Sequence, residues 1–221
     1  MEIHELKPDD KYYPKQLFTL HQPAHKLYVI GNLQILNHKS LAVVGSRAVS
    51  PYGREVTNTL VTEAVWSSIP IVSGLALGVD SVAHRAALNA GGFTIAVLPG
   101  GIERIYPASH KKLAEDIIRN GGAIISEYAG TMRPHAYHFI ARNRIIAGLA
   151  HAVLITEAAE KSGSLHTAQF ALEQGKEVLA VPGSIFSLTS IGSHSLITQG
   201  AQLVQNAAQV LNLFAIPQKL P

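Results

Sequence analysis

Short apolar runs rich in β-branched residues recur along most of the chain, and a helix-like stretch follows most of them. The runs are Leu41–Val44, Pro70–Val72, Thr94–Leu98, Ala123–Ile125, Ala152–Thr156 and Val178–Val181. Such near-continuous apolar runs are typical of parallel strands buried on both faces. Helices are predicted over residues 53–67, 79–90, 109–120, 140–149 and 164–175, with Gly91, Gly121 and Gly175 as C-terminal stops. Strands alternating with helices predict an α/β fold: a doubly wound, mostly parallel sheet with helices on both faces.

The two ends of the chain do not follow this repeat. Residues 1–40, with Pro14, Pro23 and an apolar run at Leu27, are expected to form an N-terminal extension packed on the core. Residues 41–212 are predicted to form the main domain. Residues 213–221 are apolar, end in proline and are expected to be a tail or linker.

Composition narrows the class of protein. Of 221 residues, 47% are hydrophobic and 15% are charged, which is typical of a folded chain with a large core. The absence of cysteine excludes disulfides, thiolate metal sites and a cysteine nucleophile. The polar start does not resemble a secretory signal, and no apolar run is long enough for a bilayer, so a cytoplasmic protein without a membrane partner is expected. The net charge of +3 permits an anionic ligand.

The turns after the predicted strands are the first candidates for chemistry, because ligands of open parallel sheets bind at the carboxyl ends of the strands. Gly45-Ser46-Arg47 follows the first of these strands, Ser73-Gly74 the second, and Ser162-Gly163-Ser164 opens a helix. Glycine allows close backbone approach, and free helix amides bind phosphate. The alternatives are a solvated surface arginine at Arg47 and an ordinary serine N-cap at Ser162 or Ser164.

A third candidate combines an aromatic ring with cations. Phe139 lies three residues before Arg142, and Asn143 and Arg144 follow. Aromatic rings stack nucleic-acid bases while arginines hold the phosphate backbone. The alternative places Phe139 in the core and pairs the arginines with Glu127 or Glu157.

A further basic and aromatic cluster contains Tyr106 and Lys111, for which a rigid turn and a solvated helix face are the alternative interpretations.

Several catalytic signatures are absent from the sequence. There is no P-loop, no dinucleotide fingerprint and no nucleophile elbow, so no cofactor is expected. His135 and His138 lack a third metal ligand nearby. Asp80 and His84 lie four residues apart and are interpreted as a capping residue and a polar helix residue. Glu127 and Glu157 could act as an acid and base, but salt bridges to Arg142 or Arg144 are favoured.

Taken together, these motifs resemble the DNA processing protein A (DprA/Smf) family over about residues 12–205. The similarity rests on Pro14, Pro23, Leu27-Tyr28, Gly31, Val44–Arg47, Ser73–Asp80 with Ala83-His84, Ile105–Pro107, Ser126–Tyr128, Phe139–Ile146, Ser162–Ser164 with Thr167-Ala168, Val181–Gly183, Gly192, Leu196-Ile197 and Gly200-Ala201. The resemblance implies an extended Rossmann-like fold, single-stranded DNA binding, a homodimer and the loading of RecA during natural transformation, without catalysis. By position, Arg47, Phe139, Arg142 and Arg144 would lie in the DNA groove.

Two other functions compete with DNA binding. One is a nucleotide-binding enzyme similar to phosphoribohydrolases, whose P-G-G-x-G-T run is only half matched at Pro99-Gly100-Gly101 and whose following glutamate is missing. The other is a purely structural module that dimerises through its apolar C-terminal third and has no affinity for polyanions.

Overall fold

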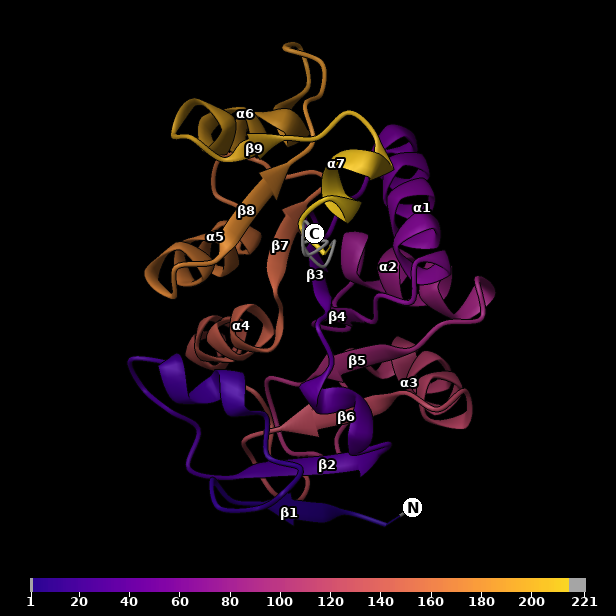
Figure 1. Ribbon diagram of the computed structural model, residues 1–221, viewed down its shortest axis with the longest axis vertical. Helices are drawn as coiled ribbons and strands as arrows, with labels where there is room; N and C mark the ends of the chain where they lie inside the picture. Colours follow the sequence, from indigo (N-terminus) through magenta and orange to yellow (C-terminus); the bar gives the residue numbers. More distant parts are fainter. Residues whose placement is uncertain (1, 215–221) are drawn as a thin grey trace, which may run out of the picture.

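All six predicted strands are present, run parallel to one another and form the centre of one sheet. The computed structural model describes residues 2–214. Within these residues the strand order is β1-β2-β6-β5-β4-β3-β7-β8-β9, which Figure 1 shows from β1 at the bottom to β9 at the top. The doubly wound, mostly parallel α/β fold is confirmed.

The bounds of the elements differ from those predicted by a few residues. The strands are β1 His4–Leu6, β2 Leu27–Gly31, β3 Leu41–Val44, β4 Ile71–Ser73, β5 Thr94–Val97, β6 Ala123–Ser126, β7 Ala152–Ile155, β8 Glu177–Ala180 and β9 Gln202–Leu203. The helices are α1 Pro51–Trp66, α2 Val79–Asn89, α3 Lys111–Arg119, α4 Ala136–Leu149, α5 Ser164–Glu173, α6 Ile191–Thr198 and α7 Ala207–Leu211. Short 3-10 turns cover Lys15–Thr19, Gln34–Asn37, Ala108–His110 and Leu188–Ser190.

The largest correction concerns α4, which begins four residues before the predicted start at residue 140. Pro134 disfavours helix at the preceding residue and stands just outside the helix. His138 Nδ1 then accepts a hydrogen bond of 2.8 Å from the backbone N–H of His135 and closes the first turn. Phe139 therefore lies inside the helix, one turn from Arg142.

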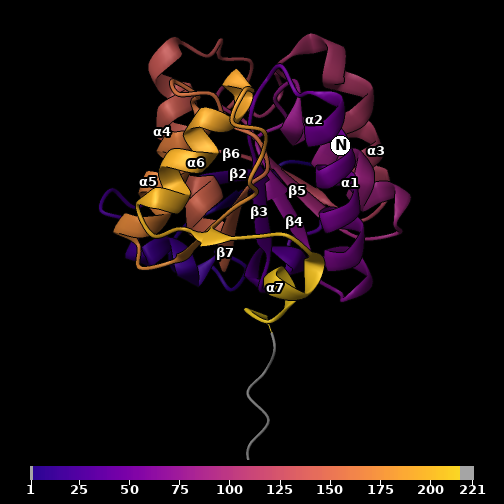
Figure 2. The ribbon, with the colours of Figure 1, turned by 90° about the horizontal axis from the view of Figure 1, so that it is seen from above.

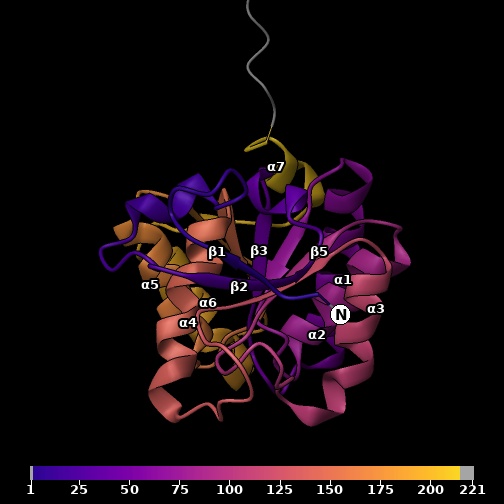
Figure 3. The ribbon, with the colours of Figure 1, turned by 90° about the horizontal axis from the view of Figure 1, so that it is seen from below.

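The N-terminal residues join the sheet. β1 pairs antiparallel with β2, and β2 pairs antiparallel with β6, so residues 4–31 extend the sheet at one edge. Figure 3 shows β1 and β2 from below. The predicted tail of residues 213–221 lies outside the described residues except for its first two. The division into extension, domain and tail stays a prediction.

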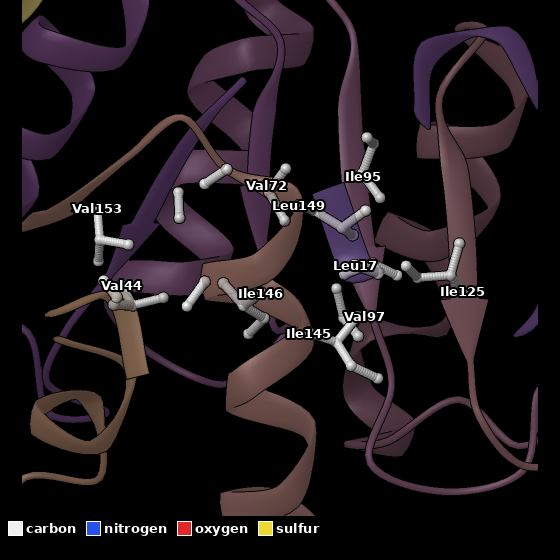
Figure 4. Packing of buried hydrophobic residues seen from close by; sticks show 14 of the residues in the cluster. Leu17, Val44, Val72, Ile95, Val97, Ile125, Ile145, Ile146, Leu149 and Val153 are labelled. Carbon is white, nitrogen blue, oxygen red and sulfur yellow. The ribbon is translucent and has the colours of Figure 1, made fainter. Parts of the chain in front are cut away.

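Helices cover both faces because each strand buries alternate side chains on opposite sides. Val44, Val72 and Val97 face α4 and α5, whereas Leu41, Val43 and Ile71 face α1 and α2. Figure 2 shows these two helix layers on either side of the strands. Figure 4 shows Ile145, Ile146 and Leu149 of α4 packed against the strand side chains. Burying each such side chain contributes about 1.5–3 kcal/mol to folding.

No helix within residues 2–214 is long and apolar enough to cross a membrane.

Candidate nucleic-acid interface

The strand order reverses between β3 and β7, which lie side by side in parallel. The chain leaves β3 toward α1 on one face and leaves β7 toward α5 on the other face, so the loops separate and a crevice opens between them. The two loops meet at their bases, where Ser46 N–H donates to the Glu157 carbonyl at 2.7 Å. A Cβ at Gly45 would lie 2.6 Å from the same oxygen, so only glycine permits this contact.

A cleft of about 720 Å³ occupies this position, and we call it the switch-point cleft. It brings together residues from four sheet-edge loops and from α4. The predicted site residues that line it are Gly45, Ser46, Arg47, Tyr106, Phe139, Arg142, Asn143, Ser162, Gly163 and Ser164. Gly74 lines an adjoining hollow that also contacts Arg47 and Phe139. α7 and the end of the described chain lie on the opposite side from the cleft, where the parallel strands begin (Figure 2).

Three side chains form an aromatic and cationic group in the cleft. The Arg47 guanidinium lies over the Phe139 ring, 5.2 Å from its centroid. Tyr106 meets the same ring edge-on at 5.4 Å. Arg47 and Tyr106 are exposed and Phe139 is half-buried, so Phe139 does not belong to the core. A cation beside an accessible ring is the arrangement that stacks a base and holds its phosphate.

Arg142 plays a different part, since its side chain is only 5% exposed. Its Nη1 donates to the carbonyls of Gly74 and Val97, at 2.6 Å each. Burial lowers the pKa of Arg142 to about 10, against the opposing effect of Asp80. A Cβ at Gly74 would overlap the guanidinium, which explains the glycine. Arg142 therefore holds two loop ends together beneath the cleft and adds a poorly screened positive charge there.

Asn143 connects α4 to the turn that opens α5. Its amide donates to the Gly163 carbonyl at 3.1 Å, and its Oδ1 accepts from Arg142 Nε at 3.1 Å. The alternative of an ordinary serine N-cap is not realised, because Gly163 is the N-cap of α5 and Ser162 Oγ lies 2.8 Å from Ser164 Oγ. The Ser164 N–H donates to Ser162 Oγ at 3.4 Å and the Leu165 N–H to the Ser162 carbonyl at 3.1 Å, so the first two amides of this ten-residue helix have partners within the turn. The start of the helix lines a cleft that also holds cations, and its dipole adds positive potential there.

Two exposed polar residues that line the cleft are not among the residues predicted from the sequence. Lys161 and His166 are both exposed and flank the Ser162–Ser164 turn. Their positions directly beside a phosphate-type turn were a usable signal. The charged residues that line the cleft are three cations, Arg47, Arg142 and Lys161, and one carboxylate, Asp80. The positive charges are in excess, so the cleft favours anions.

Arg144 and Lys111 are not among the residues that line the cleft. Arg144 pairs with Glu127 at 2.5 Å, and both side chains are mostly buried. This is the alternative interpretation of Arg144 stated from the sequence. Lys111 is exposed at the start of α3. A DNA contact by either residue stays a prediction.

The buried acids have structural partners. Glu157 accepts hydrogen bonds from Ser50 and from Thr189 Oγ1, the latter at 2.7 Å. The predicted pairing of Glu157 with an arginine is therefore wrong among the described residues. Asp80 accepts from the N–H groups of Gly74 and Ala76 at 3.0 and 3.4 Å, and burial raises its pKa.

The remaining candidates for catalysis or metal binding also form structural contacts. His84 Nδ1 lies 2.7 Å from Thr94 Oγ1, so His84 and Asp80 have separate partners and do not form a dyad. In the part of the chain that the structure describes, no group of three metal-ligating side chains occurs. The geometry therefore offers a binding cleft whose one lining carboxylate, Asp80, already accepts two backbone hydrogen bonds.

The fold and the cleft together define a doubly wound α/β protein with a cleft at its topological switch point, lined by three basic side chains and one carboxylate. The sequence profile of the DNA recombination-mediator protein A family matches residues 4–215, and the chain belongs to this family.

Individual relatives agree with this assignment. Protein Smf of Escherichia coli is 46% identical over 208 residues, which cover 94% of this chain and 56% of that protein. The solved structure of DNA processing protein A from Streptococcus pneumoniae superposes with a TM-score of 0.91 at 40% identity, over 98% of this chain and 76% of that one. The Helicobacter pylori protein, solved to describe its single-stranded DNA binding mode, has a TM-score of 0.87 at 33% identity, over 97% and 96% of the two chains.

Proposed function

We propose that this chain binds single-stranded DNA in the switch-point cleft, with phosphates held by cations and by the positive N-terminal end of α5, and with bases stacked on Phe139. The observation that carries the proposal is the Arg47 guanidinium 5.2 Å from the Phe139 ring centroid, in a cleft that the start of α5 also lines. This pairing provides both contacts that a single strand needs and requires no particular base sequence.

The family assignment supports this proposal. The family is one of DNA recombination mediators, and the H. pylori relative is a single-stranded DNA-binding protein. The chain spans 56% of the E. coli relative, so activities of the whole relative are carried over as proposals only.

We propose on the same basis that the protein acts without catalysis, in the cytoplasm, as a homodimer that loads RecA onto DNA during natural transformation or other recombination. Family membership supports these roles.

The proposal is tested by measuring the affinity of the protein for a labelled oligothymidylate by fluorescence anisotropy at two salt concentrations. Removing the cation in Arg47→Ala is expected to weaken binding and to reduce the log–log salt slope by about 0.7, the value for one phosphate on a single strand. Lys39→Gln is the matched control, because Lys39 is exposed and precedes β3 at the opposite edge of the sheet. Equal affinity of the Arg47 variant and the wild type would refute the assignment of the cleft.

A further inference from the structure

A second hollow lies directly beyond the loop that carries Arg47. It measures about 570 Å³ and runs between α1 and α2, which pack side by side in Figures 1 and 2. We call it the α1–α2 groove. Val49 and Pro51 form its near end, and Arg47 and Ala48, which precede them in the chain, line the switch-point cleft. The loop of residues 47–51 thus separates the α1–α2 groove from the switch-point cleft.

The groove carries two exposed arginines above an apolar floor. Arg54 projects from the first turns of α1 and Arg85 from α2, while Val49 and Val82 are half-buried and buried below them. Among residues 2–214 neither arginine takes part in an ion pair. Guanidinium forks without a partner match phosphate oxygens, and an apolar floor accepts sugars and bases.

The spacing suits the continuation of one strand. α2 starts against the cleft loop, where Val79 N–H donates to the Ser46 carbonyl at 3.1 Å. Arg85 lies six residues further along this helix, which corresponds to about 9 Å at the helical rise. Arg54 lies a single turn beyond Ser50, the N-cap of α1. The two arginines therefore extend the positive surface of Arg47 away from the switch point.

We propose that the α1–α2 groove is a second phosphate-binding subsite that holds the continuation of the single strand bound in the switch-point cleft. The proposal rests on the proposed function of that cleft. The occupant is the phosphodiester backbone of the same strand, passing over the loop of residues 47–51, with Arg54 and Arg85 contacting successive phosphates. Glu55, exposed on the same groove, opposes this binding by charge.

The experiment compares strand lengths. Affinities for oligothymidylates of about 4 to about 16 nucleotides, the range of single-strand site sizes, are measured by fluorescence anisotropy. The variants are wild type, Arg54→Gln/Arg85→Gln, Arg47→Ala, and the control Lys15→Gln/Lys39→Gln, which removes two exposed charges near Asn37 at the opposite edge of the sheet. Thermal melting checks that each variant is folded.

The double groove variant is expected to bind the shortest strands like wild type and to lose affinity only on longer ones. Each phosphate contact adds about 0.7 to the log–log dependence of affinity on salt. Through two contacts, raising the salt concentration from about 50 to about 200 mM weakens binding about sevenfold. On long strands the double variant should therefore lose about sevenfold less affinity than wild type over this range. Glu55→Gln is expected to strengthen binding of long strands alone.

Three results would overturn this subsite: an unchanged affinity of the double variant at every length, an equal loss at every length, or no gain from Glu55→Gln. Arg47→Ala tests the cleft separately. If Arg47→Ala weakens binding at all lengths while the groove variants change nothing, only the subsite is refuted. If wild type binds no strand, the proposed function and the subsite are both refuted.

Discussion

At the scale of single residues, three arginines of the same chemistry have three different roles. Arg47 is exposed over an aromatic ring, Arg142 is buried on backbone carbonyls, and Arg144 pairs with Glu127. Arg142 and Arg144 are two residues apart on α4 and so point about 200° apart around the helix. The guanidinium group determines which kinds of bond each arginine can form, whereas the position of the arginine in the chain determines which partner lies within reach.

Phe139 is the residue whose removal best separates binding from folding. Phe139→Leu keeps apolar bulk at this half-buried position but removes the ring. We expect single-strand affinity to fall by about 1–3 kcal/mol, the value of one base stacked on an aromatic side chain. Anisotropy titration measures the affinity, and urea unfolding is expected to show little change in stability. A large loss of stability with intact DNA binding would assign the ring to the core instead.

Gly74 and Gly163 form a matched pair of glycines in and beside the cleft. In Gly74→Ala the new methyl would overlap the buried Arg142 guanidinium. We expect a loss of about 2 kcal/mol in the free energy of unfolding, typical of overpacking. At Gly163 the backbone φ is −61° and, apart from Gly163 and its two chain neighbours, no described residue has an atom within 4 Å of the added Cβ, so stability is expected to be unchanged. Chemical denaturation compares the two, and equal stabilities would contradict the packing argument.

At the scale of elements, the loop after β7 fixes the start of α1, a helix that follows a different strand. Ser50 caps α1 by accepting from Gly53 N–H at 3.0 Å, and Glu157, after β7, accepts from both the N–H and the hydroxyl of Ser50. β7 therefore positions α1, although β3 precedes α1 in the chain. This cross-connection holds the two sides of the switch point at one fixed spacing.

The contact between α2 and β5 predicts a dependence of stability on pH. His84 is fully buried against Thr94, and burial lowers its pKa from 6.5 to about 3. Between these values the unfolded chain binds a proton that the folded chain does not, so stability falls as pH falls. The effect of one such group is up to about 1.4 kcal/mol per pH unit.

Urea unfolding at several values of pH between 6.5 and 4 measures this effect. His84→Gln is expected to show a shallower decline than the parent, and His21→Gln, at an exposed histidine, is expected to match the parent. Other buried groups also make stability depend on pH. Burial lowers the pKa of His138, which acts in the same direction as His84, and raises the pKa of Asp80, which acts in the opposite direction. The contribution of His84 is therefore isolated by comparing variants with the parent. Identical declines in parent and His84→Gln would refute the assignment.

At the scale of the whole molecule, the sheet separates two layers of helices and gathers the carboxyl ends of its parallel strands at one edge. The net charge is only +3, yet Arg47, Arg142 and Lys161 all contribute positive charge to the cleft at this edge. The location of these charges is therefore a better guide to an anionic ligand than their sum.

Discrimination between single and double strands should follow from this geometry. Stacking on Phe139 needs a free base face, and a duplex offers one only after unpairing and unstacking. We expect a duplex to bind at least about fivefold more weakly than a single strand, because one stacked base contributes about 1–3 kcal/mol. Competition of unlabelled duplex against labelled single strand measures the ratio. Equal competition would indicate a purely electrostatic surface and contradict base stacking.

The central strands and helices were predictable from local patterns, because a strand buried on both faces must be apolar along its whole length. Leu41–Val44 was predicted residue for residue. By contrast, β9 and α7 are too short for a periodic pattern, and β1 is defined by its pairing with β2. Such elements are stabilised by neighbours distant in sequence, which a local pattern does not contain.

For the candidate site, the Gly-Ser turns and the edge where they gather followed from the chain alone, since parallel strands bring their carboxyl ends together. The roles of individual side chains did not. Burial of Arg142, the pairing of Arg144 with Glu127, and the presence of Lys161 in the cleft all depend on which loops approach one another. A polar residue must satisfy its hydrogen bonds and its charge, and the partners that do so lie on other elements, so folding in three dimensions assigns them.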